Sequence, residues 1–208
     1  NNPDDGHSRT VLKARVQLPA NNHAGYIYSD VLTSHFALHV GSRERGIKFF
    51  LDTSLGTGAG TSDNVNVQVF GGDLNAEPEE NGIRTLQETC TSRNDCYMDT
   101  FLSVDPTTLP FGGLTFPTCN PVKRIDYLFV RNVTNSGQFA KVTNHWLIGI
   151  YPADTTSGSV EVDVDGSVHV NDPYRREGLG MLDEDSLLWA SDHFGVVADI
   201  VIESKEKC

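Results

Sequence analysis

The sequence VNVQVFGGDLN runs from Val65 to Asn75 and constrains the fold of this chain more than any other stretch. Its first six residues alternate between apolar and polar side chains, a period of two that predicts a half-buried β-strand. Asp73 and Asn75 stand where this strand ends, and residues two apart in an extended chain point to the same side. The stretch therefore predicts a carboxylate and an amide side by side at the end of a strand.

Two further stretches place polar side chains beside strand-forming residues. Arg124-Ile125-Asp126-Tyr127 is followed by the apolar run Leu128-Phe129-Val130, so we expect Asp126 in or next to a buried strand, where a carboxylate needs a partner. Ser191-Asp192-His193-Phe194 precedes a strand-like run from Gly195 to Ile202. A sheet would bring these side chains to one rim. A histidine beside carboxylates is suited to act as a general base, so the three stretches indicate a hydrolase.

These stretches, together with Leu32-Thr33-Ser34-His35-Phe36, resemble motifs of the endonuclease/exonuclease/phosphatase superfamily. This group includes deoxyribonuclease I, abasic-site endonucleases, inositol-polyphosphate phosphatases and neutral sphingomyelinases. The resemblance implies an α+β fold, the four-layer α/β/β/α sandwich of the deoxyribonuclease I-like type. Family members begin with a strand that carries an Asn and a strand that carries a metal-binding Glu, and we find neither here. The sequence therefore resembles the C-terminal portion of such a domain, with the N-terminal part missing.

The resemblance also implies a role for each polar side chain of the motifs. His193 would be the general base, and Asp126 would hold its ring and stabilise the imidazolium. Asp73 would orient the attacking water or help to deprotonate it. Asn75 and His35 would donate hydrogen bonds to the phosphoryl group and so bind the substrate. These five residues are the predicted catalytic set.

Asp192 is the residue that the resemblance assigns to a metal ion. Mg²⁺ suits a shell of carboxylate and water oxygens, with Mn²⁺ or Ca²⁺ as the other candidates. The substrate would be a phosphoester of a lipid, a small molecule or a nucleic acid. The formal net charge of −12 disfavours tight nonspecific binding to a polyanion, so it favours a lipid or small phosphoester over an endonuclease acting on DNA or RNA. A noncatalytic binding or scaffold protein with an incomplete metal site is the alternative from another class.

Length and pattern predict one domain over residues 1–208, with a divergent insertion at about 137–185 that carries no family motif. No run approaches twenty apolar residues, so we expect no transmembrane segment. Protein partners cannot be read from the sequence. We expect helices from Ser42, as N-cap, to Leu55 and from Pro78 to about Thr89. Strand hairpins are predicted over residues 9–36 and 159–170, and a further strand over residues 146–151.

Several residue types allow two interpretations. Phe111 and Phe116 either line a pocket or pack under a long loop. Histidines outside the motifs are expected on the surface or in loops: His7, His23, His145 and His169. Two groups of basic residues are either solvated faces of a helix and a strand or local phosphate contacts: Arg43, Arg45 and Lys48, and Lys123, Arg124 and Arg131. The Gly56–Gly60 stretch precedes a strand instead of following one, so it does not fit a nucleotide-binding loop.

The cysteines and a sequon favour a secreted or extracytoplasmic location over a cytoplasmic one. The chain has four cysteines, and their spacing does not fit a zinc site. Cys90, Cys96 and Cys119 could supply one disulfide in an oxidising compartment. Asn132-Val133-Thr134 is a glycosylation sequon and is compatible with secretion.

Overall fold

The computed structural model describes residues 8–19, 26–55, 65–88, 96–133, 138–150, 160–162, 168–170 and 191–204. The expected turn at residues 21–25 and the Gly56–Gly60 stretch lie outside these residues, as do Cys90, Cys208, His7 and His23. None of the helices in the described part of the chain is long and apolar enough to cross a membrane.

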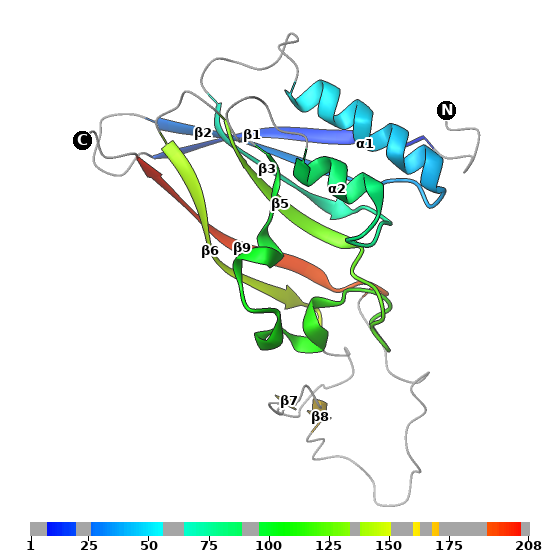
Figure 1. Ribbon diagram of the computed structural model, residues 1–208. Coiled ribbons are helices and arrows are strands. Elements are labelled where there is room, and N and C mark those ends of the chain that lie inside the picture. Colours follow the sequence, from blue (N-terminus) through cyan, green and yellow to red (C-terminus); the bar gives the residue numbers. More distant parts are fainter. Residues whose placement is uncertain are drawn as a thin grey trace, which may run out of the picture.

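The larger sheet has five strands, and Figure 1 shows it at the centre of the fold. Its spatial order is β1 (Val11–Pro19), β2 (Tyr26–Ser34), β3 (Val65–Asp73), β5 (Asp126–Asn132) and β4 (Met98–Asp99). β1 and β2 pair antiparallel, which confirms the first predicted hairpin. β2 and β3 are parallel and are joined across the sheet by α1 (Val40–Leu55), whereas β5 runs antiparallel to β3.

β3 is buried on both faces, not on one as its alternating sequence predicts. Val67 and Phe70 are both fully buried, although residues three apart point to opposite sides of a strand. Phe70 packs toward the helices in a cluster with Phe36 and Phe129. Val67 packs toward the second sheet. The polar residues of the pattern are satisfied inside the protein, because the Gln68 side chain accepts a hydrogen bond from Tyr97.

Two helices cover one face of this sheet, α1 and α2 (Asn81–Glu88) (Figure 1). The predicted inward residues of α2, Ile83 and Leu86, are fully buried. Phe50 of α1 stacks on Phe70 of β3, with 4.0 Å between the ring centroids. This apolar cluster is the main core, and it fixes the two helices over the strands that carry the motifs.

Both helices begin at residues other than those predicted. α1 begins at Val40, and the carbonyl oxygen of His39 accepts hydrogen bonds from the N–H groups of Ser42 and Arg43. Ser42 is therefore inside the first turn and is not the N-cap. α2 begins at Asn81 because a turn closed by the N–H of Glu80 and the carbonyl of Glu77 precedes it. Proline and glutamate signals mark the region of a helix start more reliably than the starting residue.

A second sheet packs on the other face of the first. It consists of β6 (Gln138–Ile148) and β9 (Gly195–Ser204), which pair antiparallel. Val67 and Val130 of the first sheet form a cluster with Ala140 of β6, and four valines and isoleucines pack around it. The order of helices, sheet and sheet gives three layers of the expected sandwich (Figure 1). β6 begins well before residue 146, where the sequence predicts a strand.

The predicted hairpin near residue 165 is confirmed by the backbone. β7 (Val160–Val162) and β8 (Val168–Val170) pair antiparallel, with Val160 opposite Val170. The division of the chain into one domain with an insertion at about 137–185 stays a prediction.

The long loop between β4 and β5 contains three short 3₁₀ turns, η1 (Thr100–Ser103), η2 (Pro106–Thr108) and η3 (Pro110–Gly113). Asp99 caps η1, because its carboxylate accepts a hydrogen bond from the N–H of Phe101. The loop covers His145 of β6, which was expected on the surface but is buried and contacts the Thr100 hydroxyl at 2.9 Å. Burial lowers the pKa of His145 below its ordinary value.

Three of the basic residues that allowed two interpretations are buried structural groups. Arg124 donates to Asp99 at 2.7 Å and lies between the rings of Phe101 and Tyr127. Arg131 donates to Gln68, and Arg43 forms an ion pair with Glu80. The interpretation as solvated faces is wrong for these arginines. Arg45, Lys48 and Lys123 are exposed, which fits both interpretations, so the choice between them stays a prediction.

Candidate active site

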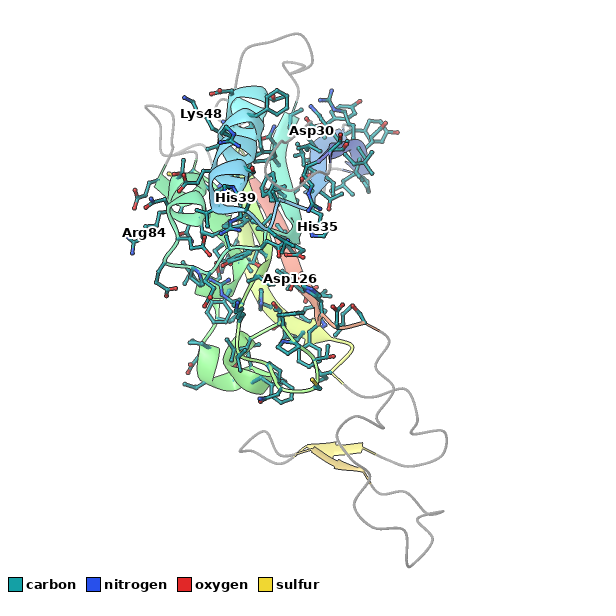
Figure 2. The ribbon with its side chains drawn as sticks, turned by 90° about the vertical axis from the view of Figure 1, so that its right-hand side faces the viewer. Asp30, His35, His39, Lys48, Arg84 and Asp126 are labelled. Carbon is teal, nitrogen blue, oxygen red and sulfur yellow. The ribbon has the colours of Figure 1, made fainter. Side chains whose placement is uncertain are left out.

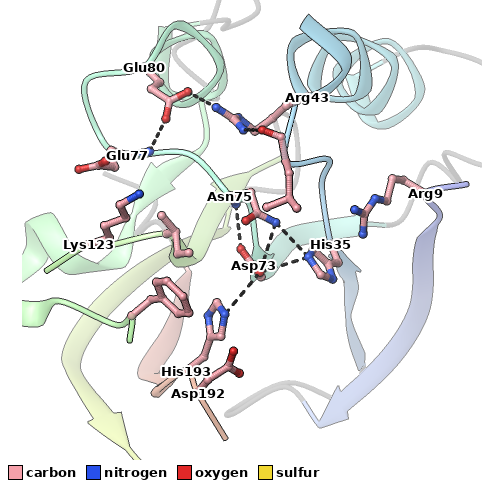
Figure 3. A pocket seen from close by; sticks show the side chains of 13 residues that line it. Arg9, His35, Arg43, Asp73, Asn75, Glu77, Glu80, Lys123, Asp192 and His193 are labelled. Atoms are coloured by element: carbon pink, nitrogen blue, oxygen red, sulfur yellow. Dashed lines mark hydrogen bonds and ion pairs between the residues drawn. The ribbon is translucent and has the colours of Figure 1, made fainter. Parts of the chain in front are cut away.

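The sheet topology brings the motif residues to one edge. β2 and β3 are parallel, so their carboxyl ends meet there, and antiparallel β5 begins at the same edge. A cleft of about 760 Å³ opens at this place (Figure 3). Five of the six predicted site residues line it: His35, Asp73, Asn75, Asp192 and His193. Asp126 is half-buried at the start of β5 and contacts His193.

Asp73 and Asn75 are in contact, but a turn brings them together instead of an extended chain. Asp73 is the last residue of β3, and its carboxylate accepts a hydrogen bond of 2.8 Å from the N–H of Asn75. Asn75 has a φ of 50°, in the left-handed region that asparagine tolerates better than most residues. Its side-chain amide then donates to the other carboxylate oxygen at 3.3 Å. The local turn therefore fixes both side chains at the cleft.

His35 follows β2 directly and lies against this pair. Its Nε2 is 2.9 Å from the amide nitrogen of Asn75 and 3.2 Å from a carboxylate oxygen of Asp73. The same Asn75 amide donates to the carbonyl oxygen of Phe36, so the two loops are joined at this point. The His35 side chain is 58% exposed and faces the cleft (Figure 3). It is therefore accessible to a ligand in the cleft.

His193 is oriented by two carboxylates. Its Nδ1 is 2.8 Å from an oxygen of Asp126, and its Nε2 is 3.9 Å from an oxygen of Asp73. Asp73 and Asp126 are direct neighbours across the β3–β5 ladder, so the two acids are held close by strand register. The ring of Phe116 packs against His193 with 4.7 Å between the centroids, which restricts how the imidazole can rotate.

The electrostatic environment favours the positively charged form of His193. Burial opposes that charge, but the hydrogen bond that His193 donates to Asp126 and the negative charges of Asp126, Asp73 and Asp192 outweigh it and raise the pKa of His193. Burial raises the pKa of Asp126, and hydrogen bonds from His193 and Thr115 counteract part of this effect. A ring whose protonated form is stabilised in this way can accept a proton from a bound molecule.

Asp73, Asp126 and His193 form a group that could hold a metal ion, since one ligand atom from each lies within 4.8 Å of the others. Asp192, which the sequence assigned to the metal, lines the cleft as an exposed residue but is not one of this group. Carboxylate oxygens are the donors that hard divalent cations prefer, so the donor chemistry of Asp73 and Asp192 fits such an ion.

Several cleft residues were not singled out as site residues by the sequence. Glu77 and Glu80 follow Asn75 in the chain, and Lys123 lies on the same side of the view as Glu77 in Figure 3. The two glutamates carry no pattern of their own, so only the fold identifies them, whereas Lys123 belongs to one of the two basic groups that the sequence left open as phosphate contacts. Phe116 lines the cleft, which agrees with the interpretation as a pocket residue. Phe111 stacks on Phe194 instead, which agrees with the interpretation as a packing residue.

Several solved structures match this chain, but no protein-family model and no curated protein does. A humanized D. rerio TDP2 with 14 mutations matches with a TM-score of 0.59 and 14% identity, over 96% of this chain and 63% of its own. A functionally unknown conserved protein from Enterococcus faecalis V583 matches with a TM-score of 0.53 and 17% identity, over 97% and 59%. Truncated Caenorhabditis elegans TDP2 gives 0.52 and 16%, over 95% and 61%.

The chain has the deoxyribonuclease I-like fold. The predicted resemblance to the endonuclease/exonuclease/phosphatase superfamily is thereby confirmed at the level of the fold. The chain spans about three fifths of the length of the three solved structures named above. At identities of 14 to 17%, a shared deoxyribonuclease I-like fold assigns no reaction to individual residues, so the roles of the site residues stay predictions.

Proposed function

We propose that this chain carries the hydrolytic centre of a metal-dependent phosphoester hydrolase, either a phosphodiesterase or a phosphatase. The observation that carries the proposal is the 2.8 Å contact between His193 and Asp126, beside Asp73 in an open cleft. A histidine oriented by a carboxylate can take a proton from an attacking water. The deoxyribonuclease I-like fold supports the same reaction class by analogy.

We propose His193 as the general base, and its contacts support this role. When its Nδ1–H donates to Asp126, the lone pair of Nε2 is free to accept a proton from water. A water on Nε2 would also lie within reach of Asp73, whose oxygen is 3.9 Å away, and would be oriented by it. Asp126 then stabilises the imidazolium that forms. No covalent nucleophile is needed for this step.

Asn75 and His35 would bind the phosphoryl group. Both side chains line the cleft beside Asp73, and the Asn75 N–H that donates to Asp73 and a ring N–H of His35 would turn to a phosphoryl oxygen when a substrate binds. Donors placed where negative charge develops on a phosphoryl oxygen stabilise the transition state. The hydrogen bond from Asn75 to the Phe36 carbonyl holds the amide in position before a substrate binds.

We assign the divalent ion to Asp73 and Asp192, with Mg²⁺ favoured and Mn²⁺ or Ca²⁺ as alternatives. His193 Nδ1 is already occupied by Asp126, so the cleft carboxylates are the better donors for a hard cation. When bound, such an ion would neutralise charge on the nonbridging phosphoryl oxygens. The residues of this chain supply the base, the water orientation and the hydrogen bonds.

The cleft favours a lipid or small phosphoester over a nucleic acid. Acidic side chains balance the cationic ones around it, and Arg43 is already paired with Glu80, so the wall is not a basic groove. Leu38 lines the cleft and is 71% exposed, which gives the rim an apolar residue. Endonuclease activity would need a continuous cationic track for the phosphate backbone.

The test is hydrolysis of bis(p-nitrophenyl) phosphate by the longest form of the protein that its gene encodes, with Mg²⁺ and with EDTA. We expect Mg²⁺-dependent turnover that His193→Ala lowers by about 10²- to 10⁴-fold, the usual contribution of a general base. Lys48→Ala is the matched control, because Lys48 is exposed on α1 and points away from Asp126 (Figure 2). Equal turnover by wild type and His193→Ala would reject the assignment.

Absence of turnover in every form, with Mg²⁺ still binding, would instead support the noncatalytic alternative. To rank substrates, the same protein is offered choline phospholipid vesicles, a soluble phosphomonoester and a DNA duplex. The proposal requires the DNA to be the poorest of the three. Preferential cleavage of the DNA would replace it with a nuclease.

We also propose a secreted or extracytoplasmic location. Cys96 is disulfide-bonded and Cys119 is an exposed free cysteine, and a structural disulfide is typical of an oxidising compartment. The sequon residue Asn132 stands at the end of β5. Fractionation of the source cells, followed by glycosidase treatment and nonreducing electrophoresis, tests this location. Recovery of a fully reduced chain from the cytoplasm would contradict it.

A further inference from the structure

Thr115 is a fully buried residue directly behind Asp126, outside the set of residues that the motifs identify. Its hydroxyl oxygen accepts hydrogen bonds from the N–H groups of Ile125, at 3.2 Å, and Asp126, at 3.3 Å. These two N–H groups belong to the start of β5, where the strand delivers Asp126 to the site. Thr115 therefore fixes the backbone at the residue that orients His193.

The hydroxyl oxygen uses both of its acceptor positions for this backbone. A hydroxyl has one donor and two acceptor positions, and the N–H groups of Ile125 and Asp126 occupy the acceptors. The carboxylate of the same Asp126 contacts His193 at 2.8 Å. The Thr115 hydroxyl therefore fixes the backbone of the residue that orients His193.

The backbone of Thr115 reaches the other partner as well. Its carbonyl oxygen accepts a hydrogen bond of 2.9 Å from the N–H of Phe194, the residue after His193. Its own N–H donates to the carbonyl of Lys123 at 2.7 Å. The segments around residues 115, 126 and 194 are thus joined through one threonine.

We infer that Thr115 is a positioning residue, which sets the Asp126 carboxylate and the His193 segment at the distance that lets the two side chains pair. The inference rests on the proposed function for its kinetic consequence, but its structural part can be measured in a protein without any turnover. It predicts that the hydroxyl, and not the bulk of the side chain, is what the pair needs.

The experiment compares Thr115→Val, which keeps the shape and removes the hydroxyl, with Thr115→Ser, which keeps the hydroxyl. Protein labelled with ¹⁵N-histidine reports the Nδ1–H signal of His193, assigned by its loss in His193→Gln. We expect this signal to shift or broaden in Thr115→Val and to stay in place in Thr115→Ser. With bis(p-nitrophenyl) phosphate and Mg²⁺, kcat should fall about tenfold in Thr115→Val, with KM unchanged, because the hydrogen bonds that fix the Asp126 backbone are lost.

Thr100→Val is the matched control, since Thr100 is also fully buried and its hydroxyl donates to a backbone carbonyl away from the cleft. It should lose stability without moving the His193 signal. If Thr115→Val does not fold, Thr115→Ala replaces it as the variant without a hydroxyl. An unchanged His193 signal and kcat in a folded variant without the hydroxyl would overturn the inference. A His193 signal that shifts in Thr115→Val, in a protein whose wild type shows no turnover, would support the inference and reject the proposed function.

Discussion

Gly72 offers the sharpest test of how backbone packing supports the site. It lies on β3 next to Asp73 with a φ of 144°, a conformation that side-chain-bearing residues rarely adopt. A Cβ placed on it would stand 2.0 Å from the carbonyl oxygen of Ser34, the last residue of β2. Gly72→Ala therefore forces the end of β2 away from β3, and His35 is the next residue along that strand.

The expected loss of stability in Gly72→Ala has two parts. An alanine held at this φ costs about 1–3 kcal/mol of backbone strain. Relief of the contact with rigid backbone costs about 1–3 kcal/mol more, as overpacking does elsewhere. Gly112→Ala is a matched control, because Gly112 also has a positive φ, 61°, but a Cβ there would meet no atom within 4 Å. It should cost only the strain of the left-handed region, about 1–2 kcal/mol.

Urea unfolding at equilibrium, followed by tryptophan fluorescence, gives the free energy of unfolding for wild type and both variants. We expect Gly72→Ala to lose about 2–6 kcal/mol in total and Gly112→Ala clearly less. Histidine NMR signals should show His35 displaced from Asn75 in Gly72→Ala alone. Equal losses in the two variants would refute the reasoning, because they would show that the strands separate at no cost. An undisturbed His35 would show that β2 does not transmit the clash to the site.

Two further predictions concern buried charges. Arg124→Met should lower the free energy of unfolding by about 3–5 kcal/mol, since it leaves the fully buried Asp99 without its cation. Urea unfolding measures this loss, and a loss below about 1 kcal/mol would contradict the prediction. His145→Gln should flatten the pH dependence of stability. The pKa of His145 is lowered in the fold, so the unfolded chain binds more protons below about pH 6.5 and wild type loses stability as the pH falls through that value. Urea unfolding at pH 7.5 and pH 5 compares wild type with His145→Gln. Equal losses of unfolding free energy on acidification would show that His145 is not the group that causes the pH dependence.

The strands of this fold could be predicted from sequence because their signal is local. Alternation marked β3, and the apolar runs after Asp126 and Phe194 marked β5 and β9. The helix starts were misplaced because a cap depends on which carbonyl is free, and the carbonyl of His39 serves α1 instead of the Ser42 side chain. The early part of β6 was missed because its inward face is completed by the other sheet, which no local pattern reveals.

The motif residues of the site could be named from sequence, but their arrangement could not. Asp73 and Asn75 were expected together for a reason that turned out to be wrong, since a left-handed turn at Asn75 makes the contact. Thr115 has no signal in the sequence, because its importance comes from three segments that meet around it. The catalytic and metal roles themselves await the assays.

The register of the central sheet explains why His193 stands where it does. Asp73 and Asp126 lie directly opposite each other on β3 and β5, and like charges at such positions destabilise a sheet. Burial raises the pKa of Asp126, and the negative charge of Asp73 adds to this rise, which is the electrostatic expression of that conflict. The imidazole of His193 reaches both carboxylates and relieves it when it carries a proton. Two carboxylates that strand register holds opposite each other therefore favour the binding of a positive charge between them, either the proton of His193 or a divalent cation.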